Sequence, residues 1–155
     1  MNKILHQSVT LRCDTGRAFG LFTISGQVES WLIKPFSEKG FAEIEPATGG
    51  KYELFWDAQN KQENSTIGCH ITALADGEFL SFDWKGPTEF KSIMNNTEPL
   101  TQVTVFFIPV ADSSTRVHLI HSGWGSSPEW EAARTYFEKA WNSAFENLRL
   151  MINGK

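Results

Sequence analysis

The C-terminal segment from Ser127 to Ile152 constrains the fold of this chain more than any other feature. Ser127, Pro128 and Glu129 supply a capping hydroxyl, a first-turn proline and a first-turn acid, the order typical of a helix start. The pattern beyond them predicts a long amphipathic helix that needs a large apolar surface to cover it. The apolar positions at helical spacing are Trp130, Ala133, Phe137, Ala140, Trp141, Ala144, Phe145, Leu148, Met151 and Ile152.

Upstream of this helix the hydrophobic period is mostly that of β-strands. Residues 4–12 predict a first strand, followed by two short helices, one capped by Asp14 and Thr15 and one running from Ser25 to Pro35. An antiparallel sheet with alternating faces has one apolar side to cover, and the long helix is its expected cover. We therefore predict an α+β helix-grip arrangement, a curved antiparallel sheet of about seven strands wrapped around the C-terminal helix. The remaining strands are expected over 41–45, 52–56, 66–74, 80–85, 101–109 and 115–122.

The last two strands are expected to form a hairpin across Asp112, Ser113 and Ser114. We predict the register that pairs Phe107 with Leu119. The same register puts Phe106 opposite Ile120 on the outer face, where the two could form an apolar patch. Such a patch is compatible with either a monomer or a weak homodimer.

Length and charge exclude several classes of protein. The 155 residues, with no linker or repeat, predict a single domain over 1–155. The net charge is −4 and the cations are dispersed, so a nucleic-acid partner is not expected. No apolar stretch is long enough for a membrane span or a signal peptide. Cys13 and Cys69 are too few for a disulfide scaffold, which favours a reducing, cytoplasmic location.

Several residues and short motifs carry a resemblance to a known family: Trp31, Gly49-Gly50-Lys51-Tyr52, Gly68, Leu80 to Trp84, Thr101 to Val105, Thr115 to His121, and Trp141. Together with the order of the segments, they resemble the helix-grip fold of the START-like (SRPBCC, Bet v 1-like) superfamily. Within it, the chain is most similar to the branch named after the C-terminal domain of the activator of heat-shock-protein-90 ATPase. Asp76-Gly77 and Ala140 depart from the branch, which has a Pro-rich turn and a glycine at these places.

The resemblance implies a cavity between sheet and helix that holds small apolar molecules in several branches, while the co-chaperone branch uses the fold to contact the chaperone. Inward-facing residues, aromatic for the most part, are the candidate lining of such a cavity, although the same side chains could simply fill a core. The candidates are Trp31, Tyr52, Leu54, Trp56, Cys69, Ile71, Phe82, Trp84, Val105, Phe107, Leu119, His121, Trp124, Phe137, Trp141 and Phe145.

Two further hypotheses concern polar chemistry and access. His121 faces the interior and could orient a ligand or act as a general base, but we favour a hydrogen-bonded core histidine. His118 and His121 point to opposite faces of a strand, so no metal site is expected, nor any cofactor. Trp124 lies between two glycines before the long helix and could act as a plug that gates the cavity.

Three functions follow, in order of preference. The first is a non-enzymatic domain that binds a small apolar or aromatic ligand beneath the helix. The second is a co-chaperone-like interaction module whose outer sheet face contacts a chaperone. The third is a cyclase- or hydrolase-like enzyme that uses His121 with Glu53 or Asp83, although strand alternation puts both acids on the outer face.

Overall fold

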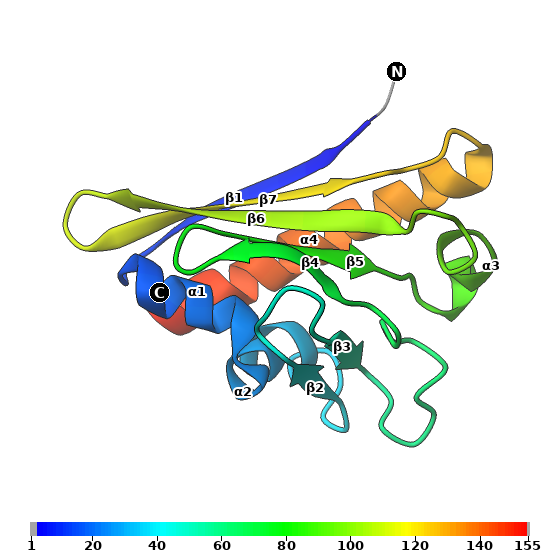
Figure 1. Ribbon diagram of the computed structural model, residues 1–155, viewed down its shortest axis with the longest axis horizontal. Helices are drawn as coiled ribbons and strands as arrows, with labels where there is room; N and C mark the ends of the chain where they lie inside the picture. The colour runs from blue at the N-terminus through cyan, green and yellow to red at the C-terminus, as the bar shows by residue number, and fades with distance from the viewer. Residues whose placement is uncertain (1–2, 155) are drawn as a thin grey trace.

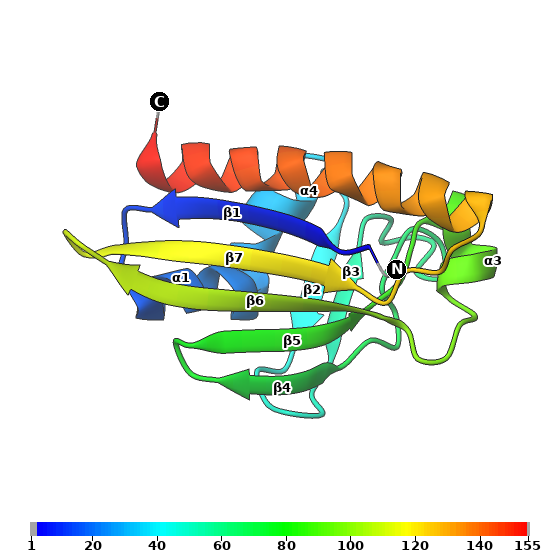
Figure 2. The ribbon, with the colours of Figure 1, turned by 90° about the horizontal axis from the view of Figure 1, so that it is seen from above.

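A five-stranded antiparallel sheet and one long helix dominate the structure, a computed structural model that describes residues 3–154. The strand order is β1-β7-β6-β5-β4, and Figure 2 shows these strands side by side with α4 (Pro128–Asn153) running along β1. The predicted helix-grip fold is confirmed. The strands are β1 (Leu5–Leu11), β4 (Ile71–Ala75), β5 (Phe79–Trp84), β6 (Thr101–Val110) and β7 (Ser114–Ser122).

The remaining two strands form a separate antiparallel pair, β2 (Phe41–Ile44) with β3 (Tyr52–Phe55). This pair lies below the main sheet in Figure 1. Backbone hydrogen bonds tie it to the segment that enters β4, from Tyr52 N to the carbonyl of Cys69 at 2.9 Å and from Ile71 N to that of Gly50 at 2.8 Å. The strands of the expected sheet are therefore present, as a five-stranded sheet and a two-stranded sheet that these backbone hydrogen bonds connect.

Two short helical segments follow β1, as predicted. The first, α1 (Thr15–Thr23), begins where Asp14 Oδ1 accepts a hydrogen bond from Arg17 N at 2.8 Å. The second, α2 (Ser25–Val28), continues into a turn of π-helix, η1 (Glu29–Ile33). The indole of Trp31 donates to the carbonyl of Leu21 at 2.8 Å, which holds the two segments against each other in the core.

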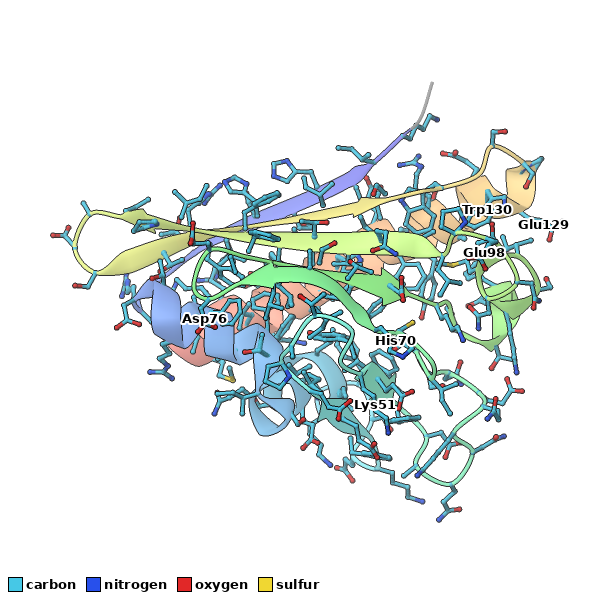
Figure 3. All side chains as sticks on the ribbon, viewed as in Figure 1. Lys51, His70, Asp76, Glu98, Glu129 and Trp130 are labelled. Atoms are coloured by element: carbon cyan, nitrogen blue, oxygen red, sulfur yellow. The ribbon has the colours of Figure 1, made fainter. Side chains whose placement is uncertain are left out.

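Both ends of α4 are fixed by side chains. Ser127 caps its start, since its hydroxyl accepts from Trp130 N at 3.2 Å, and Figure 3 labels Trp130 there. At the other end, Asn153 accepts from Arg12 N and donates to the carbonyl of Thr10, each at 2.8 Å. These bonds join the end of α4 to the end of β1. The residues that α4 buries against the sheet are Ala133, Phe137, Trp141, Ala144, Phe145 and Leu148.

The strand predicted over 66–74 begins later than expected, at Ile71. Gly68 adopts a φ of +89°, which breaks the extended backbone before Ile71. Thr66 is buried, and its hydroxyl accepts a hydrogen bond from Leu54 N at 2.9 Å. The register also shifts between Ile71 and Ala73. The regular alternation read from the sequence thus mixes a turn with a short, irregular strand.

The predicted register of the last hairpin is wrong by two residues. Phe107 lies opposite Val117, and Phe106 lies opposite His118. The strands pair as far as Val110 and Ser114, so the turn spans 111–113, one residue earlier than expected and of the same length, with Asp112 and Ser113 at positive φ. A shift of two residues keeps every side chain on its predicted face, because the strand period is two.

The predicted loop over 86–99 contains short helical structure. A 3-10 turn, η2 (Thr88–Phe90), leads into α3 (Lys91–Met94). Met94 is fully buried, and Asn95 Oδ1 accepts from Gly86 N at 2.8 Å. This segment forms one end of the space beside α4 that is described next.

Candidate functional site

A groove of about 610 Å³ lies along one flank of α4, and we refer to it as the α4 groove. Three structural features surround it: the exposed flank of α4, the segment Lys85 to Pro87 after β5, and the ends of η1 and β3. Its lining residues are Leu32, Phe36, Trp56, Asn64, Ser65, Trp84, Lys85, Gly86, Pro87, Ala132, Thr135, Tyr136, Phe137, Lys139, Ala140, Trp141 and Ser143.

Four of the predicted lining residues lie in this groove: Trp56, Trp84, Phe137 and Trp141. The other twelve are buried, and none of them lines the groove. The opening is thus at the flank of α4 and not beneath its centre. The twelve core residues are Trp31, Tyr52, Leu54, Cys69, Ile71, Phe82, Val105, Phe107, Leu119, His121, Trp124 and Phe145.

Three tryptophans form much of the groove wall, and their indole N–H groups differ in their partners. Trp56 donates to the carbonyl of Leu32 at 3.2 Å, and Trp141 donates to His121 Nδ1 at 3.0 Å. Trp84 lies between them, with ring centroids 6.3 Å from Trp56 and 5.0 Å from Trp141. The Nε1 atom of Trp84 is buried and has no hydrogen-bond acceptor among the described residues.

His121 on β7 is a structural histidine. Because Trp141 donates to Nδ1, the ring proton is assigned to Nε2, which donates to Thr101 Oγ1 at 3.0 Å. The backbone carbonyl of His121 accepts from the indole of Trp124 at 2.9 Å. Burial lowers the pKa of His121 to about 3, so its ring is neutral at pH 7. Both ring nitrogens are occupied by protein partners, as expected for a core histidine.

The acids considered as partners for His121 lie elsewhere. Glu53 accepts from the backbone N of Gly68 at 2.7 Å. Asp83 accepts from Gln102 Nε2 at 2.6 Å. Both carboxylates belong to the outer, partly exposed positions of their strands, as the alternation predicts. The structure therefore does not assemble the acid–base pair of the enzymatic hypothesis.

The side chains of Tyr52 and Cys69 are also buried in the core. The Tyr52 hydroxyl donates to the carbonyl of Phe22 at 2.7 Å, and its ring stacks on Phe82 with centroids 3.8 Å apart. Burial raises the pKa of Tyr52 above its usual value and raises that of Cys69 to about 12. Neither group is ionised at neutral pH, and neither lines the α4 groove.

Trp124 does not plug the groove. It is 7% exposed, and its ring packs against His121 and Phe137 with centroid distances of 4.3 and 6.0 Å. The flanking glycines allow a close approach of the backbone to its neighbours, since a Cβ at Gly125 would lie 2.4 Å from the Trp130 ring. The segment is a packed connection into α4, and the gating hypothesis has no support in this geometry.

The histidine on the other face of β7 has a different partner. His118 Nδ1 lies 2.9 Å from His6 Nε2 of the adjacent β1, and their rings are stacked. Partial burial and the nearby His6 and Arg116 lower the pKa of His118. Within residues 3–154 no group of three or more His, Cys, Asp or Glu side chains could hold a metal ion.

Several groove residues were missed by sequence reasoning. Phe36 follows the proline that ends the second helical segment, and Tyr136 lies outside the apolar stripe of α4. Both rings are unusually exposed, 50% for Phe36 and 41% for Tyr136. The sequence signal that could have identified them is a single aromatic residue at a position where the pattern predicts a polar, exposed side chain. Lys85 and Lys139 gave none, because single lysines on a strand end and a helix are ordinary surface residues.

Solved structures confirm the fold. A crystal structure of an Hsp90 activator from Plasmodium falciparum has a TM-score of 0.72 and 18% identity, with 97% of this chain and 96% of that one covered. A protein from Mesorhizobium loti has a TM-score of 0.71 and 17% identity, with 97% of both chains covered. The Aha1 dimer from Colwellia psychrerythraea has a TM-score of 0.65 and 12% identity over 99% of this chain and 98% of that one.

Sequence comparison gives the family. No match was found among curated proteins. The described residues contain no helix that is both long and apolar enough to cross a membrane. The sequence profile described as activator of Hsp90 ATPase homolog 1-like protein matches residues 13–153, which is nearly the whole chain. The chain therefore belongs to the activator of Hsp90 ATPase homolog 1-like family.

Proposed function

We propose that this protein binds a small aromatic or apolar compound in the α4 groove. The observation that carries the proposal is the unfilled space of about 610 Å³ against an aromatic wall. Ligand sites of proteins measure roughly 300–1,000 Å³ and are lined mainly by apolar and aromatic groups. A flat aromatic ligand placed here would cover the accessible surface of Trp56, Phe36 and Tyr136, while Trp84 and Trp141 form the buried floor behind it.

Exposed aromatic surface in the groove supports the same function. Phe36 and Tyr136 are about half exposed, although most of the other large rings are buried. Covering apolar surface stabilises a complex by about 25 cal/mol per Å² before the cost of association is subtracted. Tyr136 is held in place by an edge contact with Phe90, with centroids 5.5 Å apart. The groove thus offers binding surface without requiring the core to open.

Calorimetric titration with 2-naphthamide and 2-naphthoate tests this function. The variant Ala140→Phe places a ring into the groove and should abolish binding of both compounds. Asn142→Phe is the matched control, because Asn142 is on the same helix, exposed and outside the groove lining. Binding to neither compound by the unmodified protein, or unchanged binding by Ala140→Phe, would refute the proposal.

Contact with a chaperone is the second candidate function. It is favoured by the family match and by the fold shared with the Plasmodium falciparum Hsp90 activator. A surface suited to such a contact is the outer face of β6, where Phe106, Ile108 and Val110 are between 42% and 47% exposed. Isolated apolar side chains are common on surfaces, but three on one strand face form a contiguous stripe.

The ATPase rate of an Hsp90 homologue, measured with and without this protein, tests the second function. Stimulation that is lost in a Phe106→Ser/Ile108→Ser variant would support it. Ile4→Ser is a suitable control, because Ile4 is 53% exposed and lies outside β6. No stimulation at any ratio of the two proteins would exclude a direct activator role for that chaperone.

A further inference from the structure

The charged side chains that line the α4 groove are all positive. Among its described lining residues are two lysines, Lys85 and Lys139, and no carboxylate. This is not a property of the whole chain, which has 18 acidic and 14 basic residues. The groove is thus a locally cationic, aromatic surface on an acidic protein.

Both charged groups of the groove are hydrogen-bond donors, whereas the hydroxyls of Thr135, Tyr136 and Ser143 can donate or accept. Lys139 is exposed and makes no hydrogen bond or ion pair with a described residue. Lys85 Nζ donates to the carbonyl of Ile67 at 2.6 Å, which leaves two further N–H groups on its ammonium.

The third donor is buried. Trp84 is 3% exposed and its Nε1 has no acceptor among the described residues, whereas the indoles of Trp56 and Trp141 are both hydrogen-bonded. An unsatisfied buried donor costs about 1–3 kcal/mol, so such groups are rare and need an explanation. Because Nε1 itself is not exposed, a ligand acceptor in the groove removes that cost only when the Trp84 side chain moves toward it on binding.

Carboxylates near the groove but outside its lining are Glu63, Glu89 and Glu53, the last close to Lys85 because it accepts from Gly68 N, next to the Ile67 carbonyl that binds Lys85. Glu63 is paired with Lys91 at 3.2 Å and accepts from the Thr88 hydroxyl at 2.7 Å. Glu89 lies close enough to Tyr136 to contribute, after burial, to raising the pKa of that phenol. Tyr136 therefore stays protonated at neutral pH, and its hydroxyl is one more neutral donor at the groove.

From these observations we infer that the ligand of the α4 groove is an aromatic carboxylate or a comparable organic anion. The aromatic part lies against the tryptophan wall, and the anionic oxygens accept from Lys139, Lys85 and the Trp84 indole. This inference rests on the proposed ligand-binding function and specifies the charge of the ligand. It predicts selection by charge among compounds of one shape.

Three compounds with the same ring system test the inference: 2-naphthoate, neutral 2-naphthamide and cationic 2-naphthylmethylamine. The dissociation constants should rise in that order, with about tenfold between the first two, since a hydrogen bond to a charged group contributes about 1.5–3 kcal/mol and solvent screens part of it. Raising the salt concentration should weaken the binding of 2-naphthoate and leave that of 2-naphthamide nearly unchanged.

Lysine variants test which side chains cause the preference for 2-naphthoate over 2-naphthamide. Lys139→Gln should lose most of the preference for 2-naphthoate, and Lys85→Gln/Lys139→Gln should bind acid and amide equally. Lys139→Gln breaks no intramolecular bond, so it provides a readout even where the double variant folds poorly. Lys51→Gln is the control, because Lys51 precedes β3 at the end opposite Trp56 and is labelled apart from α4 in Figure 3.

The outcomes separate the inference from the proposed function. Equal affinity for acid and amide, or tighter binding of the amine, would overturn the inference and leave the groove as a binding site for neutral compounds. An unchanged preference in Lys139→Gln and in the double variant would also overturn it. Binding of none of the three compounds would refute the proposed function itself.

Discussion

The indole of Trp141 on α4 donates a hydrogen bond of 3.0 Å to Nδ1 of His121 on β7. This bond joins the long helix to the sheet at a point where both side chains are buried. It also fixes the tautomer of the imidazole and thereby the direction of the second bond, to Thr101. The helix is therefore joined to the sheet by a hydrogen bond between two buried side chains.

A pair of tryptophan variants should show how much the Trp141–His121 hydrogen bond contributes to the free energy of unfolding. Trp141→Phe and Trp84→Phe remove the same atoms from side chains that are 2% and 3% exposed. Trp141→Phe leaves His121 Nδ1 without a donor, whereas Trp84→Phe removes an N–H that has no partner. Urea unfolding should show a larger loss for Trp141→Phe, by about 1–2 kcal/mol. Equal losses would contradict the assigned hydrogen bonds.

Acid should destabilise the protein through His121. Its pKa is about 3 in the folded state, below the value of 6.5 expected when unfolded, so the unfolded state binds more protons between these values. The free energy of unfolding should therefore be highest above about pH 6.5 and fall as the pH is lowered toward 3. The slope attributable to this residue approaches about 1.4 kcal/mol per pH unit.

The control for this pH dependence is His121→Gln, whose side chain does not titrate. The difference between the two stability curves isolates the histidine from the carboxylates that also titrate in acid. A difference that stays constant between pH 4 and pH 7 would show that His121 is not held neutral by burial.

Trp124→Ala should behave as a core truncation. The ring is buried against His121 and Phe137, so its removal should cost about 3–5 kcal/mol of stability. Association rates of 2-naphthoate, measured by stopped-flow fluorescence on the folded fraction, should change little. A variant of normal stability with much faster association would restore the gating hypothesis.

The cysteines should be unreactive in the folded protein. Cys69 is fully buried with a pKa raised to about 12, and burial also raises the pKa of Cys13. Thiol reagents at pH 8 should modify Cys69 only at the rate of unfolding, as followed by mass spectrometry. Rapid modification of Cys69 without denaturant would show that the core opens near β4.

The helix-grip fold was predictable because its strongest signals are local. The cap at Ser127 and the apolar stripe that follows determine α4, and Asp76-Gly77 determines a hairpin turn in which Gly77 has a φ of +72°. The hairpin register was not predictable to the residue, because Asp112 and Ser113 adopt positive φ in a three-residue turn over 111–113 that the sequence does not distinguish from one over 112–114. The prediction of which side chains face the core was still correct, since a shift of two residues leaves each side chain on the same face of the sheet.

The candidate site was only partly predictable. Inward-facing aromatics identify what is buried, but periodicity does not distinguish a ring that fills the core, such as Phe82, from one that borders a groove, such as Trp84. The groove forms where α4 passes the segment after β5, and that contact depends on tertiary packing. Lys85 and Lys139 both line the groove but come from distant parts of the chain, so no local sequence pattern predicts their shared location.

Indole resonances of the uniformly ¹⁵N-labelled protein, titrated with 2-naphthoate, give the most direct test of the central claim. The indoles of Trp56, Trp84 and Trp141 belong to the α4 groove, whereas Trp31 and Trp124 lie in the closed core. The account predicts saturable shifts for the three groove indoles, largest for Trp84, with Trp31 and Trp124 nearly unmoved. Shifts centred on Trp31 and Trp124, or none at saturating ligand, would contradict it.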